Sequence, residues 1–63
     1  MNELKIKKLR KEKGWTLQYV ANKVGLTNQA INLIETGQRT PSYKVLCELE
    51  KLFQEPHQEL LQK

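Results

Sequence analysis

Residues 17–36, LQYVANKVGLTNQAINLIET, decide the fold of this chain. Apolar residues recur in this stretch at the three- and four-residue spacing of amphipathic helices, once before Gly25 and once after Thr27. Glycine readily adopts the left-handed conformation that often ends a helix, so Gly25 should close the first helix. The hydroxyl of Thr27 can accept a hydrogen bond from a free backbone N–H at the start of the second, and Thr16 can cap the start of the first in the same way. The pattern therefore predicts two helices joined by a tight turn, a helix-turn-helix.

The outer side of the second helix is expected to carry no charge, because Ile31 and Ile34 should face the core. That side presents Asn28, Gln29, Asn32 and Leu33, with Thr27 at the tip. Side-chain amides can make paired hydrogen bonds to the edge of adenine, and aliphatic groups or a threonine methyl pack against the methyl of thymine. From these residues alone, contact with base edges and an ordinary solvated surface are both open interpretations.

Further positions along the chain fit one family pattern in order and spacing. They are Arg10, Gly14-Trp15-Thr16, Ala21, Gly25, Ile31, Ile34-Glu35, Gly37 and Pro41-Ser42. With them, the stretch from about Ile6 to about Leu61 resembles the Cro/C1-type helix-turn-helix domain of phage repressors and many bacterial regulators. The resemblance implies an all-α, compact, five-helix, lambda-repressor-like fold. It also implies one domain over residues 1–63 and a structural ion pair between Arg10 and Glu35.

Three more helices are expected around the helix-turn-helix. One should run from about residue 3 to residue 13 with Asn2 as its cap, and another from about residue 43 to residue 54 with Ser42 as its cap. Pro56 should begin a short last helix. Trp15 should belong to the core and His57 to the surface. The apolar residues near the carboxyl end could close the core or form a dimer surface: Phe53, Leu60 and Leu61.

Charge is distributed unevenly along the chain. Residues 1–44 contain nine Lys or Arg and three Glu, whereas residues 45–63 contain two Lys and four Glu, so +6 and −2 give the net charge of +4. A basic region of this kind suits contact with a polyanion such as nucleic acid. A membrane surface would require a broad apolar stripe with aromatic residues, and the first helix offers only a narrow stripe. We therefore expect no membrane contact.

The residue inventory argues against metal binding and catalysis. One Cys and one His cannot supply the four ligands of a structural zinc site, and Asp is absent. Cys47 and His57 have no evident third group to orient them as a nucleophile and base. We expect no enzymatic activity, cofactor, metal or small-molecule ligand. A lone Cys and the lack of a signal peptide favour the cytoplasm, with a bacterial or phage-encoded protein acting at the nucleoid.

The sequence therefore predicts a sequence-specific regulator of transcription, a repressor, that binds double-stranded DNA as a homodimer on a palindromic operator. The residues expected to contact bases are Thr27, Asn28, Gln29, Asn32 and Leu33. The residues expected to contact phosphates are Thr16, Gln18, Gln38, Arg39, Thr40 and Lys44. Many family members carry Gln where this chain has Leu17, so Gln18 is the candidate substitute.

Two other functions for the same fold are considered. A small protein-interaction module, such as an antitoxin or anti-regulator, should carry aromatic or aliphatic anchors on the outer side of the second helix, where only Leu33 qualifies. A non-specific nucleic-acid coat should bind random and specific duplexes equally.

Overall fold

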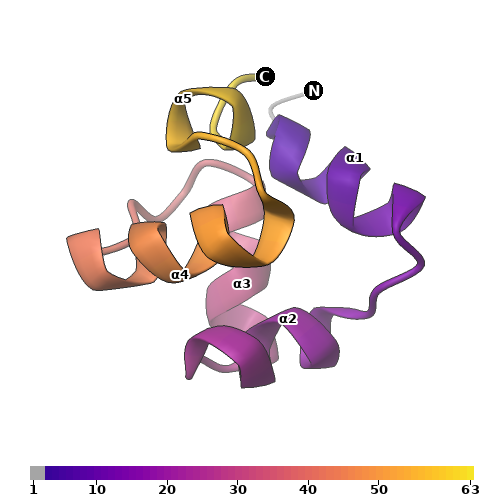
Figure 1. Ribbon diagram of the computed structural model, residues 1–63. Coiled ribbons are helices and arrows are strands. Elements are labelled where there is room, and N and C mark those ends of the chain that lie inside the picture. Colours follow the sequence, from indigo (N-terminus) through magenta and orange to yellow (C-terminus); the bar gives the residue numbers. More distant parts are fainter. Residues whose placement is uncertain (1–2) are drawn as a thin grey trace.

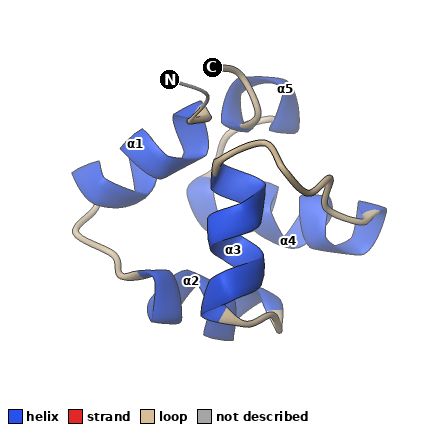
Figure 2. Ribbon diagram, turned by 180° about the vertical axis from the view of Figure 1, so that it is seen from behind, coloured by secondary structure: helices blue, strands red, loops and turns tan. Residues whose placement is uncertain are grey.

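A computed structural model describes residues 3–63, which form five helices and no strands. The helices are α1 (Lys5–Glu12), α2 (Leu17–Val24), α3 (Asn28–Glu35), α4 (Tyr43–Phe53) and α5 (His57–Leu60). Figure 1 shows α4 and α5 on the near side with α3 behind them, and Figure 2, from behind, shows α3 in front. The all-α, five-helix fold expected from the sequence is confirmed. No helix between residues 3 and 63 has the length and apolar character needed to cross a bilayer.

The turn between α2 and α3 is built as the sequence predicts. Gly25 has φ 74° and ψ 31°, the left-handed conformation, and the backbone N–H of Leu26 donates to the carbonyl of Ala21 at 2.9 Å. The hydroxyl of Thr27 accepts a hydrogen bond from the backbone N–H of Ala30 at 3.1 Å. Leu26, before the cap, packs against the core, which includes Ile31 of α3. This apolar contact across the start of α3 fixes the direction in which the helix begins.

The caps of α2 and α4 are also as expected. The hydroxyl of Thr16 accepts from the backbone N–H of Tyr19 at 3.0 Å, and the hydroxyl of Ser42 accepts from that of Val45 at 3.3 Å. Each cap satisfies one of the free N–H groups at a helix start. The end of α4 falls at Phe53, since the next residue, Gln54, is left-handed with φ 58°.

The expected start of the first helix was wrong. α1 begins at Lys5, not near residue 3, and Leu4 occupies the cap position without a side-chain hydrogen bond. Leu4 is extended, with φ −86° and ψ 161°, and its backbone N–H donates to the carbonyl of Glu35 at 2.7 Å. This bond connects the segment that precedes α1 to the end of α3. Asn2, the expected cap, lies outside the described residues.

The core lies between the five helices and contains Ile6, Val20, Ala21, Ile31, Leu49, Phe53 and Leu60. Phe53 is 2% exposed and Leu60 is 0% exposed, so both belong to the core of one chain. Leu61 is half-buried and packs against the same cluster. The alternative that placed Phe53 and Leu60 on a dimer surface is therefore wrong. Trp15 packs partly buried against the cluster, as expected.

α5 is attached to the rest of the chain by polar contacts as well as by Leu60. One carboxylate oxygen of Glu50 accepts from the backbone N–H of His57 at 2.7 Å and lies 2.8 Å from its ring Nδ1. The hydrogen bond with the imidazole and that with the backbone N–H lower the pKa of Glu50 below its ordinary value. Lys5 forms an ion pair with Glu59 at 2.9 Å, and this contact raises the pKa of Lys5. Both ends of the described chain thus meet beside α5.

Candidate nucleic-acid interface

α3 has one exposed side without charge. Thr27, Asn28, Gln29 and Asn32 are exposed, whereas Leu33 is half-buried. The buried side consists of Ala30, Ile31, Ile34 and Glu35. Glu35 is the one charged residue of α3 and is 1% exposed, so the outer side presents amides and one hydroxyl. In Figure 2 this helix stands in front of the other helices.

A buried ion pair fixes the carboxyl end of α3. Nε of Arg10 donates to one carboxylate oxygen of Glu35 at 2.7 Å, and Nη2 donates to the other at 3.3 Å. Nη1 of Arg10 donates to the backbone carbonyl of Trp15 at 2.8 Å. The guanidinium therefore joins α1, α3 and the segment before α2. Within residues 3–63, no buried side-chain nitrogen or oxygen lacks a hydrogen-bond partner. Such a pair holds its position because both charges are matched.

The amino terminus of α2 is one of two places where phosphate contacts are expected. Thr16 is exposed, but its hydroxyl already accepts a backbone hydrogen bond. The side-chain nitrogen of Gln18 donates to the side-chain oxygen of Asn22 at 2.8 Å, so this amide lies along α2. Sequence reasoning missed this pairing, although a four-residue spacing of amides on a helix could have indicated it. Gln18 would have to turn away from Asn22 to reach a phosphate.

The loop between α3 and α4 is the second place where phosphate contacts are expected. The backbone N–H groups of Gln38 and Arg39 both donate to the carbonyl of Leu33, at 2.9 and 3.2 Å, and fold the loop back on the end of α3. The side chain of Gln38 donates to the hydroxyl of Thr36 at 3.1 Å. Arg39 and Thr40 are exposed, and neither side chain makes a hydrogen bond within residues 3–63. Figure 2 shows this loop on the same side as α3.

Lys44 lies exposed on the first turn of α4, directly after the loop. An ammonium group beside the free N–H groups of a helix start is suited to an anion. Thr16, Arg39, Thr40 and Lys44 thus lie at the starts of α2 and α4 and in the loop that follows α3. Gln18 and Gln38 lie in the first turn of α2 and in the loop after α3, and their side-chain amides donate hydrogen bonds to Asn22 and Thr36.

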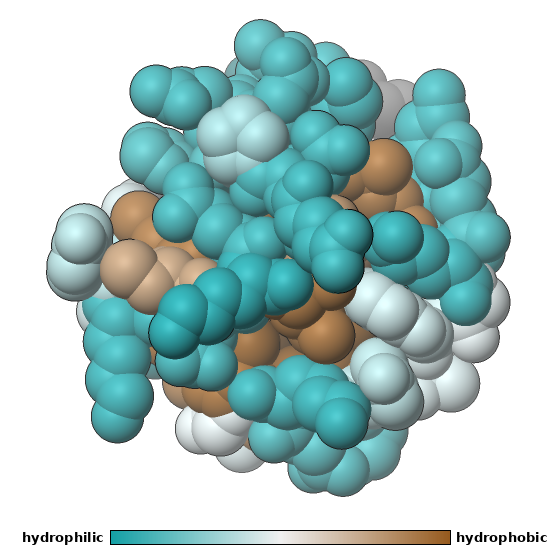
Figure 3. All heavy atoms as spheres, viewed as in Figure 1, coloured by the Kyte–Doolittle hydropathy of each residue, from teal (hydrophilic) through white to brown (hydrophobic). Residues whose placement is uncertain are grey.

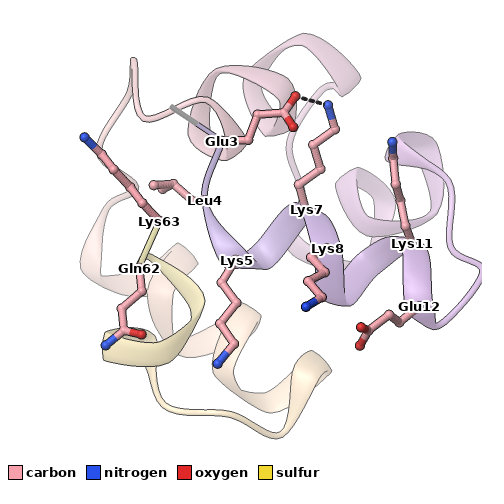
Figure 4. A pocket seen from close by; sticks show the side chains of 9 residues that line it. All are labelled: Glu3, Leu4, Lys5, Lys7, Lys8, Lys11, Glu12, Gln62 and Lys63. Atoms are coloured by element: carbon pink, nitrogen blue, oxygen red, sulfur yellow. Dashed lines mark hydrogen bonds and ion pairs between the residues drawn. The ribbon is translucent and has the colours of Figure 1, made fainter. Parts of the chain in front are cut away.

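Another lysine-rich surface follows α1. An open groove there is lined by Glu3, Leu4, Lys5, Lys7, Lys8, Lys11, Glu12, Gln62 and Lys63 (Figure 4). Part of its positive charge is neutralised, because Lys5 pairs with Glu59 and Lys7 pairs with Glu3. Figure 3 shows that the face turned away from the exposed side of α3 is covered largely by hydrophilic side chains. Nowhere in residues 3–63 do three or more potential metal ligands gather.

Comparison with known proteins agrees with the helix-turn-helix described above. A family model described as helix-turn-helix matches residues 6–60. The HTH-type transcriptional regulator AnsR of Bacillus subtilis (strain 168) is 39% identical over 61 residues, which cover 97% of this chain and 53% of that protein. The uncharacterized HTH-type transcriptional regulator YqaE of the same organism is 40% identical over 48 residues, covering 76% of this chain and 41% of that protein. The chain thus spans about half the length of these curated relatives. No solved structure matches it.

Proposed function

Because the chain belongs to the Cro/C1-type helix-turn-helix family, we propose that it is a sequence-specific DNA-binding domain of a transcription regulator. In this proposal residues 1–63 act as one domain and α3 enters the major groove of double-stranded DNA. The observation that carries the proposal is the exposed, uncharged and amide-rich side of α3. A side without charge can approach base edges closely, while the cations around it meet the phosphates.

Base recognition is assigned to the exposed side of α3. Gln29 is on the first turn, and its amide can both donate to and accept from the edge of adenine. Asn28, Asn32 and Thr27 would contact neighbouring bases. Leu33 is half-buried, so the part of its side chain that remains accessible suits a thymine methyl. The pair between Arg10 and Glu35 would hold the helix at a fixed angle during this contact.

Phosphate contacts would set the register of α3 in the groove. Arg39 and Lys44 supply charge, and Thr16 and Thr40 stand at exposed positions beside helix starts. Gln18 and Gln38 would exchange their present partners, Asn22 and Thr36, for a phosphate. The amide–amide and amide–hydroxyl bonds are exposed and short-range, so such an exchange needs only side-chain rotation.

We further propose a homodimer on a palindromic operator, acting as a repressor in a bacterial cell. A single small domain covers about 600–1,000 Å² on DNA, less than most specific complexes, and a second copy doubles the contact. Phe53 and Leu60 are buried, so the dimer contact needs other side chains. Tyr43, at the start of α4, is 82% exposed and is the candidate. A dimer seated on a promoter would exclude polymerase from it.

Selection from a random duplex pool tests this function. It should return a common motif with two-fold symmetry and half-sites about one helical turn apart. A Gln29→Ala variant should then bind the selected operator more weakly by roughly 1–3 kcal/mol, while binding to random DNA barely changes. Lys51→Ala is a control, because Lys51 is exposed on α4 away from α3. A pool without a shared motif would favour the non-specific coat if random duplex is still bound, and the protein-interaction module if no duplex is bound.

The phosphate contacts are tested by salt dependence. Arg39→Ala should weaken binding to the operator and to random duplex alike, and should reduce the slope of log K against log salt by about one unit. Lys8→Ala, on the groove along α1, removes the same charge at a different place. A slope that is unchanged in Arg39→Ala, or reduced equally in both variants, would remove Arg39 from the contacts.

A further inference from the structure

The corner between α1 and α2 carries two aromatic rings with a lysine over each. The rings of Trp15 and Tyr19 lie with centroids 5.1 Å apart and planes tilted by 33°. Nζ of Lys13 is 5.4 Å from the centroid of the Trp15 ring, and Nζ of Lys23 is 5.3 Å from that of the Tyr19 ring. We call these four residues the corner patch. The proposed contacts with DNA use none of them.

The corner patch is held in place from the inside. Trp15 meets the buried ring of Phe53 edge-on at a centroid distance of 5.3 Å and packs against the core. Tyr19 stacks on that anchored ring and is 39% exposed. Lys23 follows Tyr19 by four residues on the same side of α2. Cation–π contacts hold each ammonium group near its ring, so the charges are partly pre-organised.

The two lysines of the corner patch have no acidic partner in the part of the chain that the structure describes. Lys5 and Lys7, by contrast, are paired with Glu59 and Glu3. Glu12 precedes Lys13 in the sequence but lines the groove along α1. The corner patch therefore combines two unneutralised positive charges with accessible aromatic surface.

We infer that the corner patch is a docking site for an acidic segment of a partner protein. Carboxylates of Asp or Glu on such a segment would pair with the two ammonium groups. Its aliphatic side-chain stems or prolines would pack on the exposed part of the Tyr19 ring.

Nucleic acid fits the corner patch less well. Single strands bind by stacking bases on open aromatic faces, and here each ring already contacts an ammonium group and the other ring. Duplex DNA is assigned to the exposed side of α3. Because Thr16, a proposed phosphate contact, follows Trp15 and accepts from the backbone N–H of Tyr19, binding of duplex DNA is measured in the same variants.

The fluorescence of Trp15, the only tryptophan, gives a direct test with the full chain. A twelve-residue poly-L-glutamate peptide should change the emission in a saturable way. The double variant Lys13→Gln/Lys23→Gln should bind it roughly tenfold more weakly, as expected for the loss of two exposed ion pairs. The control Lys8→Gln/Lys11→Gln removes the same charge from the groove along α1 and should bind as the natural chain does. Calorimetric titration of the same variants avoids any direct effect of Lys13 on the emission.

Three outcomes would overturn the assignment. Equal weakening in both double variants would show attraction by net charge alone. Tighter binding of a twelve-residue oligo-dT than of the peptide, with the same dependence on Lys13 and Lys23, would make the corner patch a single-strand site. Loss of duplex DNA binding in Lys13→Gln/Lys23→Gln would place it on the DNA surface. Tyr19→Phe keeps the ring and should retain peptide binding, whereas Tyr19→Ala should lose it. This result is independent of whether α3 reads bases.

Discussion

Two regions of the molecule are held together in different ways. In the turn between α2 and α3, the polar contacts join residues close in sequence: Thr27 with Ala30, and Leu26 with Ala21. Where α1, α3 and α5 meet, the partners are distant. Arg10 and Glu35 are 25 positions apart, and Lys5 and Glu59 are 54 apart. The first region is shaped by its own residues, whereas the second exists only after the chain has folded.

The two regions therefore have different structural roles. The turn sets the angle between α2 and α3, and each of its contacts is partly exposed and individually modest. The distant pair of Arg10 and Glu35 fixes where the carboxyl end of α3 sits against the rest of the chain. Burial makes that pair costly to break, since a charge left without its partner cannot be solvated. The orientation of the proposed recognition helix therefore depends more on α1 than on the turn that precedes it.

Removal of Arg10 should have the largest effect on stability. Arg10→Ala leaves the carboxylate of Glu35, 1% exposed, without its two hydrogen bonds. We expect a loss of about 3–5 kcal/mol. A 63-residue domain is expected to have roughly 3–9 kcal/mol in total, so the variant should be largely unfolded at 37 °C. Urea unfolding followed by circular dichroism measures the change.

A paired replacement separates the burial of a charge from the loss of packing. Arg10→Met/Glu35→Leu replaces the two charges by apolar groups and should recover most of the stability that Arg10→Ala loses. The carbonyl of Trp15, which Arg10 now contacts, would then turn to water. If the double variant is as unstable as Arg10→Ala, the long-range contact stabilises through its hydrogen bonds and not through matched charge.

The sequence allowed the local parts of the fold to be predicted. Gly25, Thr27, Thr16 and Ser42 were assigned to turns and caps that the structure contains, because a cap depends on the type of one residue and its immediate neighbours. The start of α1 was misplaced because the bond from Leu4 to the carbonyl of Glu35 crosses between distant segments. The sequence of α1 contains no pattern that predicts this bond.

The same division applies to the candidate site. Exposure of Asn28, Gln29 and Asn32 followed from helical periodicity. The pairing of Gln18 with Asn22 depends on side-chain rotamers, which the sequence does not specify. The stacking of Tyr19 on Trp15 depends on the contact of Trp15 with Phe53 of α4, a residue distant in the sequence. Glu50 is a further example, since its partner His57 lies in another helix. The contacts with bases and phosphates themselves stay predictions until a complex is measured.

Removal of a cap in the turn should have a smaller effect than removal of the distant pair. Thr27→Ala deletes the acceptor for the backbone N–H of Ala30 and should cost about 1 kcal/mol. Thr27→Ser keeps the hydroxyl and should lose only a fraction of that. Unfolding is measured without DNA, so that the proposed base contact of Thr27 has no influence. A loss in Thr27→Ala equal to that in Arg10→Ala would show that the turn, not the distant pair, dominates the placement of α3.

The contact between Glu50 and His57, which joins two consecutive helices, should be visible only through its pH dependence. The hydrogen bonds from His57 lower the pKa of Glu50 in the folded chain, so the unfolded chain binds more protons as the pH falls below the ordinary value of a glutamate. Stability contributed by Glu50 is therefore present at neutral pH and is lost as the pH falls through its lowered pKa. Glu50→Gln cannot titrate, so its melting temperature should fall less than that of the natural chain between about pH 6 and pH 3. Glu48→Gln, on the same helix, is the matched control and should keep the full decline. Parallel declines in Glu50→Gln and the natural chain would mean that α5 is held by Leu60 and by the ion pair of Lys5 with Glu59, without a measurable contribution from Glu50.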